Sequence, residues 1–397
     1  MSQQWVRSVE IPEAPVNSLM VTSDTLWAAM DSAAYFSVTN GSTWTRSSDL
    51  PLPLGGIRDL ASFGGAIYAS TYNGGVYRST DLGATWLETN DGLTANTRRA
   101  GVFVVRHDTL FVGTEWGVYR LVGATTPAWA QEGTGLVSSI SGSVDAIIVY
   151  QDALVAASGA NGVVYILPTG ATEWKPSYLR GTLSPGEAVK SFTLHQDTLF
   201  CSSQSGVYAS GDLEHWISRR SGLPFVAWSF TTLAPSGDSL FLVTNTLTLT
   251  ARTYLSTDRG ESWTLWDTQS GTEILDMEIA SGRAHEARAL GYYYAELGAT
   301  DARAVAGGVP EDFLLEQPYP NPFNPSTTIL FSIPRRSAAK LAVYDGLGRE
   351  VAVVVSKELD PGTYSLQWSA AGIPSGVYFL RLETPHGART RRLLLIR

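Results

Sequence analysis

Residues 79–86 read STDLGATW, and residues 256–263 read STDRGESW. Each octet places Ser, Asp and Gly ahead of a tryptophan at the same spacing. Asp carboxylates accept hydrogen bonds from nearby backbone N–H groups, Gly tolerates positive φ angles, and tryptophan brings a large apolar side chain. Each octet therefore predicts a tight turn between two β-strands that ends on a buried tryptophan.

The tryptophans of these two octets belong to a longer series. Tryptophans close similar stretches every 42 to 47 residues, at Trp44, Trp86, Trp129, Trp174, Trp216 and Trp263. Ahead of each one, an apolar strand, a tight turn, a second strand and a third strand recur in the same order. A period of this length with four strands is typical of a β-propeller blade.

The two ends of the repeat region indicate how the ring closes. Residues 5–12, WVRSVEIP, align with residues 44–51, WTRSSDLP, so the sequence begins on a fourth strand. Residues 273–297 supply further strands but no closing tryptophan. We infer that Trp5 completes this last blade, which makes seven blades and removes an open sheet edge. An open β-solenoid and a ring of six or eight blades remain alternatives.

Composition agrees with an all-β protein. The 397 residues include 38 Gly and 19 Pro, and only 16% are charged, so the turn formers are many and the usual helix formers few. The net charge of −9 divides into −11 for residues 1–310 and +2 for the remainder, and the acidic main region argues against nucleic acid as a partner. The single cysteine cannot form an intramolecular disulfide, and no apolar run is long enough for a membrane span. We expect a monomer.

The two octets resemble the Asp-box (BNR) repeat. That repeat occurs in sialidases, some endoglucanases, sortilin-type receptors and photosystem assembly factors, which share the propeller but no function, so the resemblance implies a fold and not catalysis. We assign a structural role to the Asp-box residues, which are Ser79, Asp81, Gly83, Trp86, Ser256, Asp258, Gly260 and Trp263.

The sequence offers no catalytic constellation. A sialidase places its first arginine in an Arg-Ile-Pro motif, and none occurs here. The nearest features are Arg58 and Asp59, which could line a central channel, and Arg99, which could attract a carboxylate or phosphate together with Arg98. For these residues a structural or solvated role is favoured over ligand contact. Trp228 and the tyrosines at 292–294 are assigned to core packing rather than to a sugar platform.

No metal or cofactor is predicted. The five histidines show none of the tight spacings of a metal site, and the lone cysteine leaves no second thiol to complete a zinc cluster.

A second region follows a stretch of small residues at 299–311. It opens with YPNPFNPSTTI at 319–329 and continues as short alternating strands separated by Asp345-Gly346 and Pro374-Ser375-Gly376, which predicts a small Ig-like β-sandwich. The residues that we single out as its signature are Pro320, Asn321, Pro322, Phe323, Asn324, Pro325, Gly376 and Tyr378.

Residues 313–397 resemble the C-terminal sorting domain of the bacterial type IX secretion system. The resemblance implies passage across the outer membrane through that machinery, removal of the domain by a sortase-like peptidase, and release or attachment at the cell surface. Proteins of this kind enter the periplasm through a signal peptide. The first twelve residues lack the basic start and apolar core of one, so we expect the export signal to lie outside this sequence.

We therefore predict an Asp-box propeller at 1–298, a linker at 299–311 and a sorting domain at 312–397. The expected function is that of an exported or cell-surface, non-catalytic propeller that binds a glycan or a protein. The alternatives are an extracellular glycosidase and a scaffold or assembly factor for surface complexes.

Overall fold

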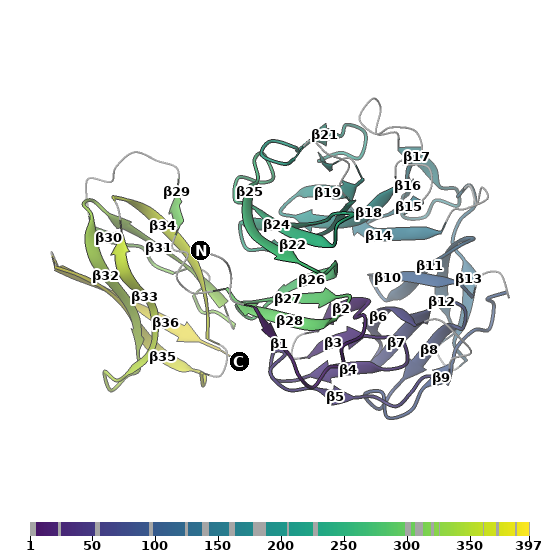
Figure 1. Cartoon of the computed structure of the whole chain (residues 1–397), viewed down its shortest axis with the longest axis horizontal. Helices are drawn as coiled ribbons and strands as arrows, with labels where there is room; N and C mark the ends of the chain where they lie inside the picture. Colours follow the sequence, from purple (N-terminus) through teal and green to yellow (C-terminus); the bar gives the residue numbers. More distant parts are fainter. Residues whose placement is uncertain are drawn as a thin grey trace. The chain divides into compact units, whose positions relative to one another are not determined.

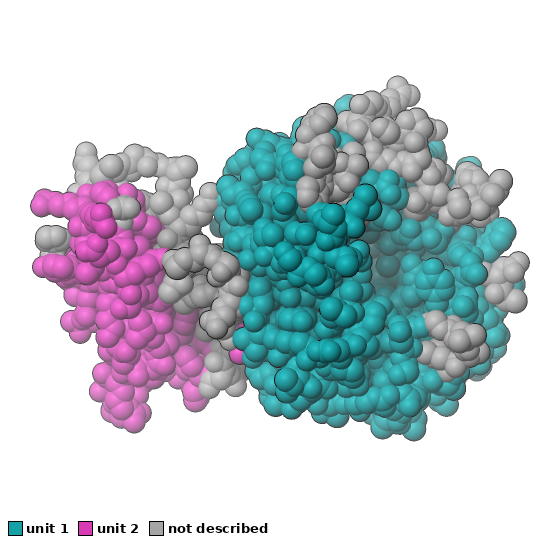
Figure 2. All heavy atoms as spheres, viewed as in Figure 1, with its two compact units in different colours: residues 1–280, 284–295 teal, residues 281–283, 296–397 magenta. Residues whose placement is uncertain are grey.

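The computed structural model describes most of the chain: residues 5–22, 25–51, 56–94, 98–123, 126–136, 143–158, 163–177, 188–204, 206–224, 229–297, 303–305, 313–318, 321–324, 326–359, 361–370, 373–385 and 387–396. The regular elements in these ranges are all β-strands. Within the same ranges, no helix has the length and apolar character needed to cross a membrane. Two compact units emerge, residues 1–280 with 284–295 and residues 281–283 with 296–397 (Figure 2).

The described part of the first unit forms seven antiparallel sheets of four strands each (Figure 1). The first strands are β2 (Ser18–Val21), β6 (Ile57–Phe63), β10 (Ala100–Arg106), β14 (Val144–Tyr150), β18 (Val189–His195), β22 (Ser229–Ser236) and β26 (Ile274–Ala280). The second strands are β3 (Leu26–Ala29), β7 (Ala66–Thr71), β11 (Thr109–Thr114), β15 (Ala153–Ser158), β19 (Thr198–Ser203), β23 (Ser239–Asn245) and β27 (Arg283–Arg288).

The outer strands complete each sheet, called here blades one to seven in chain order of their first strands. The third strands are β4 (Ala34–Ser37), β8 (Gly75–Ser79), β12 (Gly117–Val122), β16 (Val164–Leu167), β20 (Val207–Ser210), β24 (Thr250–Ser256) and β28 (Gly291–Glu296). The fourth strands are β5 (Thr45–Arg46), β9 (Leu87–Glu88), β13 (Ala128–Gln131), β17 (Lys175–Ser177), β21 (Ile217–Ser218), β25 (Thr264–Ser270) and, for blade seven, β1 (Val6–Arg7).

The first strands contact one another around a closed circle. Each first strand touches the next along the chain, and β26 touches β2. In blade seven, Val6 pairs with Tyr294 and Arg7 with Tyr293, so the N-terminal strand supplies the fourth strand as the sequence predicts. Figure 2 shows this unit hollowed at its centre. The first unit is therefore a closed β-propeller with a central channel.

Apolar side chains fill the space between neighbouring blades. In one cluster Trp27 of blade one packs with Leu60 of blade two and with Trp86, the closing tryptophan of that blade. Trp129, Trp174, Trp216 and Trp263 are likewise buried in separate clusters. Because burying a tryptophan removes a large apolar area from water, these residues account for much of the adhesion between blades.

The second unit contains two four-stranded sheets in its described residues. One sheet has the order β29 (Arg303–Val305), β34 (Gly362–Ser369), β31 (Ser326–Ile333) and β30 (Leu314–Leu315). The other has the order β33 (Glu350–Leu359), β32 (Ser337–Tyr344), β35 (Gly376–Thr384) and β36 (Gly387–Leu395). A single apolar cluster, including Phe331, Leu341, Trp368 and Leu380, joins the two sheets as in a β-sandwich.

β29 lies inside the stretch at 299–311 that the sequence predicts to be a linker. Ala304 pairs with Tyr364 and Val305 with Thr363, so these three residues extend a sheet of the second unit. The small residues around β29 show no alternation of apolar and polar side chains, so the sequence showed no sign of a strand there. The edge of β34 offers unpaired backbone groups, which any short extended segment can satisfy.

Candidate functional site

The first strands of the propeller all run in the same direction along the channel. Asp59, near the start of β6, accepts a hydrogen bond from Ser18 at the start of β2. Asp276, near the start of β26, accepts one from Leu19, which also lies at the start of β2. The starts of these three strands therefore lie at the same end of the channel. Since each blade is an antiparallel meander, the turn between its second and third strands returns to the end where the first strand begins. We call that end the top face and the opposite end the bottom face.

Asp59 ties three blades together at the channel. Its Oδ1 accepts hydrogen bonds from Ser18 Oγ (3.0 Å) and Leu60 N (2.8 Å), and its Oδ2 accepts one from Phe103 N (2.8 Å) of blade three. Burial raises the pKa of Asp59 to about 6, although these three donors oppose the rise. The carboxyl is thus an acceptor that holds neighbouring first strands in register, and Arg58 is not among these three donors.

Asp276 plays the same part on the other side of blade one. Its Oδ2 accepts from Leu19 N (2.9 Å) and its Oδ1 from Met277 N (2.8 Å), while Thr232 of blade six lies 3.5 Å away. Burial raises its pKa as well. The repeat carried a signal for this residue, because Ile-x-Asp followed by an apolar residue occurs at 57–60 and again at 274–277. Asp276 is nevertheless absent from the candidates named from the sequence.

Glu278 lies two residues further along β26 and faces the same channel. Burial raises its pKa to about 8, and the negative charges of Asp276 and Asp59 add to the rise. Glu278 is half-buried. This carboxyl is therefore largely protonated at neutral pH, with Asp276 and Asp59 as its charged neighbours.

The two arginines singled out from the sequence lie at the top face. Arg58 is 30% exposed, stacks over the ring of Tyr72 (5.1 Å), and approaches Asp145 of blade four only to 3.9 Å. Arg99 is clamped: its Nη1 donates to Glu115 (2.7 Å) and its Nε to Asn73 Oδ1 (3.3 Å). Arg99 thereby joins the second-to-third turns of blades two and three.

The other arginines of this region do not gather into a basic spot. Arg98 pairs with Glu88 at 3.4 Å, and Arg106 and Arg120 both pair with Glu132 at 3.6 and 3.4 Å. Arg98 has a carboxylate of its own, whereas Arg106 and Arg120 share Glu132, so most of the positive charge of the sequence cluster is offset.

A buried polar network lies where blades six and seven meet. Glu286 is fully buried and accepts from Arg288 Nε (2.8 Å) and Gln269 (3.1 Å), while Trp5 Nε1 donates to Asp267 (2.7 Å). Burial raises the pKa of Glu286 to about 7. Nothing in the sequence predicted this network, because its members come from residue 5 and from residues 267–288.

The Asp-box turns are built from local hydrogen bonds. In the first octet Asp81 Oδ1 accepts from Thr85 N (2.9 Å) and Ser79 Oγ (2.8 Å), and Gly83 has a φ of 81°. The second octet repeats this pattern, with Asp258 Oδ1 accepting from Ser262 N (2.9 Å) and Ser256 Oγ (2.8 Å) and with Gly260 at a φ of 75°. Both octets lie on the bottom face, away from Arg58 and Arg99.

The degenerate octet at 37–44 keeps this turn with a different side chain. Thr39 stands where the other two octets have Asp, and its hydroxyl accepts from Thr43 N at 2.8 Å. A hydroxyl thus replaces the carboxylate as the local acceptor.

The first described signature residue of the sorting domain, Asn321, is bonded to the last strand of the second unit, β36. Asn321 donates to Arg392 O (2.8 Å) and accepts from Leu394 N (2.8 Å), and Phe323 is buried against Trp368. The Asn321–Pro322 peptide bond is cis, and Asn324 is exposed. Tyr378, in the strand that Gly376 begins, donates to Pro374 O (2.8 Å). Pro320, Pro325 and Trp228 lie outside the described residues.

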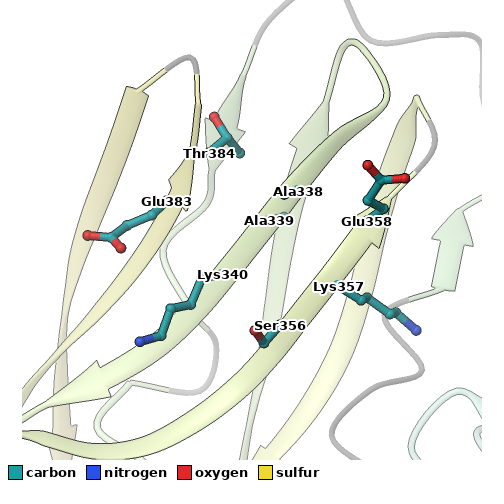
Figure 3. A pocket seen from close by; sticks show the side chains of 8 residues that line it. All are labelled: Ala338, Ala339, Lys340, Ser356, Lys357, Glu358, Glu383 and Thr384. Atoms are coloured by element: carbon teal, nitrogen blue, oxygen red, sulfur yellow. The ribbon is translucent and has the colours of Figure 1, made fainter.

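A shallow groove of about 500 Å³ runs over β32, β33 and β35 of the second unit (Figure 3). Figure 3 shows Lys340 and Glu383 projecting on one side, with Lys357 extending away from them. Lys340 is already paired with Glu350 at 2.6 Å. Two lysines and two glutamates line the groove, so it presents no single charge to a ligand.

The described residues contain no group of three or more His, Cys, Asp or Glu side chains placed to hold a metal ion. Cys201 is buried in β19.

Comparison with known proteins separates the two units. Residues 317–396 match the family described as the secretion system C-terminal sorting domain. No curated protein matches the sequence. Across 97% of its length the chain is similar to the structure of PorZ from Porphyromonas gingivalis, described as an essential bacterial surface component of the type-IX secretion system, with 14% identity and a TM-score of 0.58. It spans 60% of that structure.

Two structures of YCF48 resemble most of the chain. YCF48 bound to D1 peptide has 14% identity and a TM-score of 0.59, covering 77% of this chain and 97% of that one. YCF48 from Cyanidioschyzon merolae has 12% identity and a TM-score of 0.58, covering 74% and 98%. At such identities the likeness shows the fold alone. The chain is thus a β-propeller protein that ends in a secretion system C-terminal sorting domain.

Proposed function

We propose that this protein is exported by the type IX secretion system and acts at or beyond the cell surface as a non-catalytic binding module. The observation that carries the proposal is the match of residues 317–396 to a secretion system sorting domain. A sorting tail of this type implies export to the cell surface or outer membrane. The propeller is then the exported cargo, and its ligand is an extracellular glycan or protein.

The hydrogen bonding of the channel carboxylates supports a binding role rather than catalysis. Asp59 and Asp276 both accept backbone N–H groups that hold adjacent first strands. A glycosidase needs two carboxyl groups that flank a substrate, one of which is free to act as a base or nucleophile. Asp59 and Asp276 are committed to the ring and do not meet that need.

The solved relatives support a binding role for propellers of this fold. PorZ is described as a surface component of the type-IX secretion system, and YCF48 was solved with a bound peptide. Neither function transfers by similarity alone, because one fold hosts many functions.

Export by the type IX system is tested by fusing residues 311–397 to a red fluorescent protein that carries a signal peptide, in a bacterium with a type IX system. We expect the reporter on the cell surface or in the medium, while the same reporter without the tail stays in the periplasm. A tailed reporter that also stays in the periplasm would contradict the proposal.

The absence of glycosidase activity is tested with the purified full chain on fluorogenic sialosides and β-glucosides. We expect no release of fluorophore above the rate without protein. Turnover of any member that persists in an independently purified batch would replace the binding role with a glycosidase.

A further inference from the structure

Exposed apolar side chains of the second unit are concentrated on one of its two sheets. Eight large apolar side chains are exposed in the described part of this unit, and six of them belong to the sheet β33-β32-β35-β36 or to its end (Figure 1). The other two, Leu314 and Leu347, lie in β30 of the opposite sheet and in the turn between β32 and β33. The six, each between 36% and 49% exposed, are Val351, Val353, Val377, Phe379, Leu394 and Ile396.

Phe379 of β35 is the centre of this exposed surface. It pairs with Tyr344 of β32 on one side and with Arg392 of β36 on the other. Directly paired residues have their side chains on the same face, with Cβ atoms about 4.5–5.5 Å apart. Val377, two residues before Phe379, lies on that face as well and pairs with Leu394. These five neighbouring side chains form one continuous surface, which we call the outer patch.

The outer patch lies on the side of the sheet that faces away from the core of the unit. The alternate residues of the same strands, among them Leu341, Leu380 and Leu393, are fully buried in the apolar cluster that joins the two sheets. At its margins the exposed surface continues to Val353, in β33, and to Ile396, two residues beyond Leu394. An exposed apolar surface of this kind on a folded unit marks an interaction site.

The edge strands of this sheet offer little backbone to a partner. Beside β36, Phe323 N donates to Leu394 O and Phe323 O accepts from Ile396 N, both at 3.0 Å. Asn321 satisfies Arg392 O and Leu394 N. At the other edge, the register of β33 with β32 shifts twice, and bulges of this kind protect an edge strand from pairing. A partner of this sheet therefore has to recognise side chains rather than add a strand.

Arg392 brings a cation to the outer patch. Its side chain is exposed and makes no ion pair or hydrogen bond with another described residue. Arg381, the neighbouring cation on the same face, is instead held by Glu383 at 2.8 Å. A guanidinium with free donors favours a carboxylate from a partner. The outer patch thus matches a partner that combines apolar side chains with an acidic one.

The family of this unit identifies the kind of partner. Residues 317–396 match a secretion system C-terminal sorting domain, and a sorting domain acts by being recognised by the export machinery, which consists of proteins. Tyrosine and arginine, both present in the outer patch, are among the residues that dominate the energetics of protein interfaces. The opposite face of this sheet is buried in the core and cannot be reached by such a protein.

We propose that the export machinery binds the sorting domain through the outer patch, placing apolar side chains over Val377, Phe379 and Leu394 and a carboxylate against Arg392. The inference rests on the proposed export by the type IX system and names the surface that the machinery recognises.

The test follows export of the full chain, preceded by a signal peptide, in a bacterium with a type IX system. An antibody against the propeller measures the amount of protein outside the cell. The Val377→Thr/Phe379→Thr double variant should reduce this amount at least about tenfold, and Arg392→Gln should reduce it roughly threefold to tenfold. Threonine is chosen because it is polar but still favours a β-strand.

Two substitutions elsewhere on the unit are matched controls. Leu347→Thr removes the exposed leucine of the turn between β32 and β33, and Arg336→Gln removes an exposed cation that pairs with Glu358. Both variants should be exported at the level of the parent chain. Thermal unfolding of the purified full-length variants, followed by circular dichroism, separates lost recognition from misfolding. Should the double variant melt early, Leu394→Thr tests the same surface from β36 and should also reduce export.

Several results would overturn the inference. Export of the folded patch variants at the parent level would remove the outer patch as the recognition surface and leave type IX export intact. Retention of the unaltered chain in the periplasm would instead contradict the proposed export, and the inference with it. A dimer in sedimentation that the double variant abolishes would assign the patch to self-association. Binding of the parent chain, but not of the double variant, to vesicles that contain lipopolysaccharide would assign it to a lipid surface.

Discussion

Asp59 shows how one carboxylate can hold a propeller ring together. It accepts from Ser18 of blade one, Leu60 of its own blade and Phe103 of blade three. We expect Asp59→Ala to leave these donors unpaired and to lower the free energy of unfolding by about 2–4 kcal/mol. Urea denaturation followed by tryptophan fluorescence measures the change.

Asp108→Ala is the matched control for this variant, since Asp108 is an exposed aspartate in a bottom-face turn. It should change the free energy of unfolding by less than about 0.5 kcal/mol. Equal effects of the two substitutions would mean that Asp59 has no special structural role.

Glu278 makes the stability of the ring dependent on pH. Its pKa is about 8 in the folded protein, against an ordinary value of 4.5, so the folded state binds more protons between these pH values. Stability then falls as pH rises through this window, because deprotonation leaves a charge in the channel. We expect Glu278→Gln to stabilise the propeller by about 1–2 kcal/mol at pH 8 and much less near pH 4.5. Thermal unfolding of both proteins at the two pH values tests this, and an equal gain at both would contradict it.

At the scale of the element, β1 closes the ring with two paired residues and one tryptophan. Trp5 donates a hydrogen bond to Asp267, and its ring lies edge-on to that of Trp266 with 6.0 Å between the ring centroids. The Arg288 guanidinium stacks over the Trp5 ring, 4.9 Å from its centroid. We expect Trp5→Ala to lower the free energy of unfolding by about 2–4 kcal/mol, because it removes an apolar contact and leaves the buried Asp267 with one donor fewer. Trp116→Ala removes an exposed tryptophan and should be nearly neutral in the same denaturation experiment.

The last strand of the sorting domain depends on Asn321. This side chain bonds to β36 at Arg392 and Leu394. Asn321→Ala should cost about 1–3 kcal/mol and increase cleavage of β36 by trypsin, whereas Asn324→Ala, which changes an exposed side chain, should leave the cleavage rate as it is. Equal protection of β36 in both variants would contradict the clamp.

The strands of the propeller could be predicted from the sequence because they recur with the tryptophan repeat. The tryptophan spacing indicates four strands per blade, and the alignment of residues 5–12 with 44–51 indicates closure by the N-terminal strand, which the pairing of Val6 with Tyr294 confirms. β29 could not be predicted, since its pairing depends on the edge of β34 some 60 residues away. The Glu286–Arg288 network likewise depends on Gln269 and Trp5, which no local pattern connects to it.

At the scale of the whole molecule, the sequence predicted a propeller followed by a sorting domain. The residues that it offered as candidate ligand contacts were only part of what the top face presents. Arg58 and Arg99 lie at the top face, where Glu115 holds Arg99, while Asp59 is engaged in holding blades together. Exposure of Leu247 or Trp116 could not be read from the sequence, because an apolar residue in a β-rich chain is expected to be buried. Only the fold shows which turns share a face.

On the function proposed above, this propeller leaves the cell through the type IX system. The most direct measurement is antibody labelling of the propeller on intact cells and in the medium, with the full chain carrying a signal peptide, in a type IX host and in the same host without its outer-membrane secretion channel. We expect labelled propeller outside the parent host and periplasmic accumulation in the channel mutant. Equal amounts outside both hosts, or periplasmic retention in both, would contradict it.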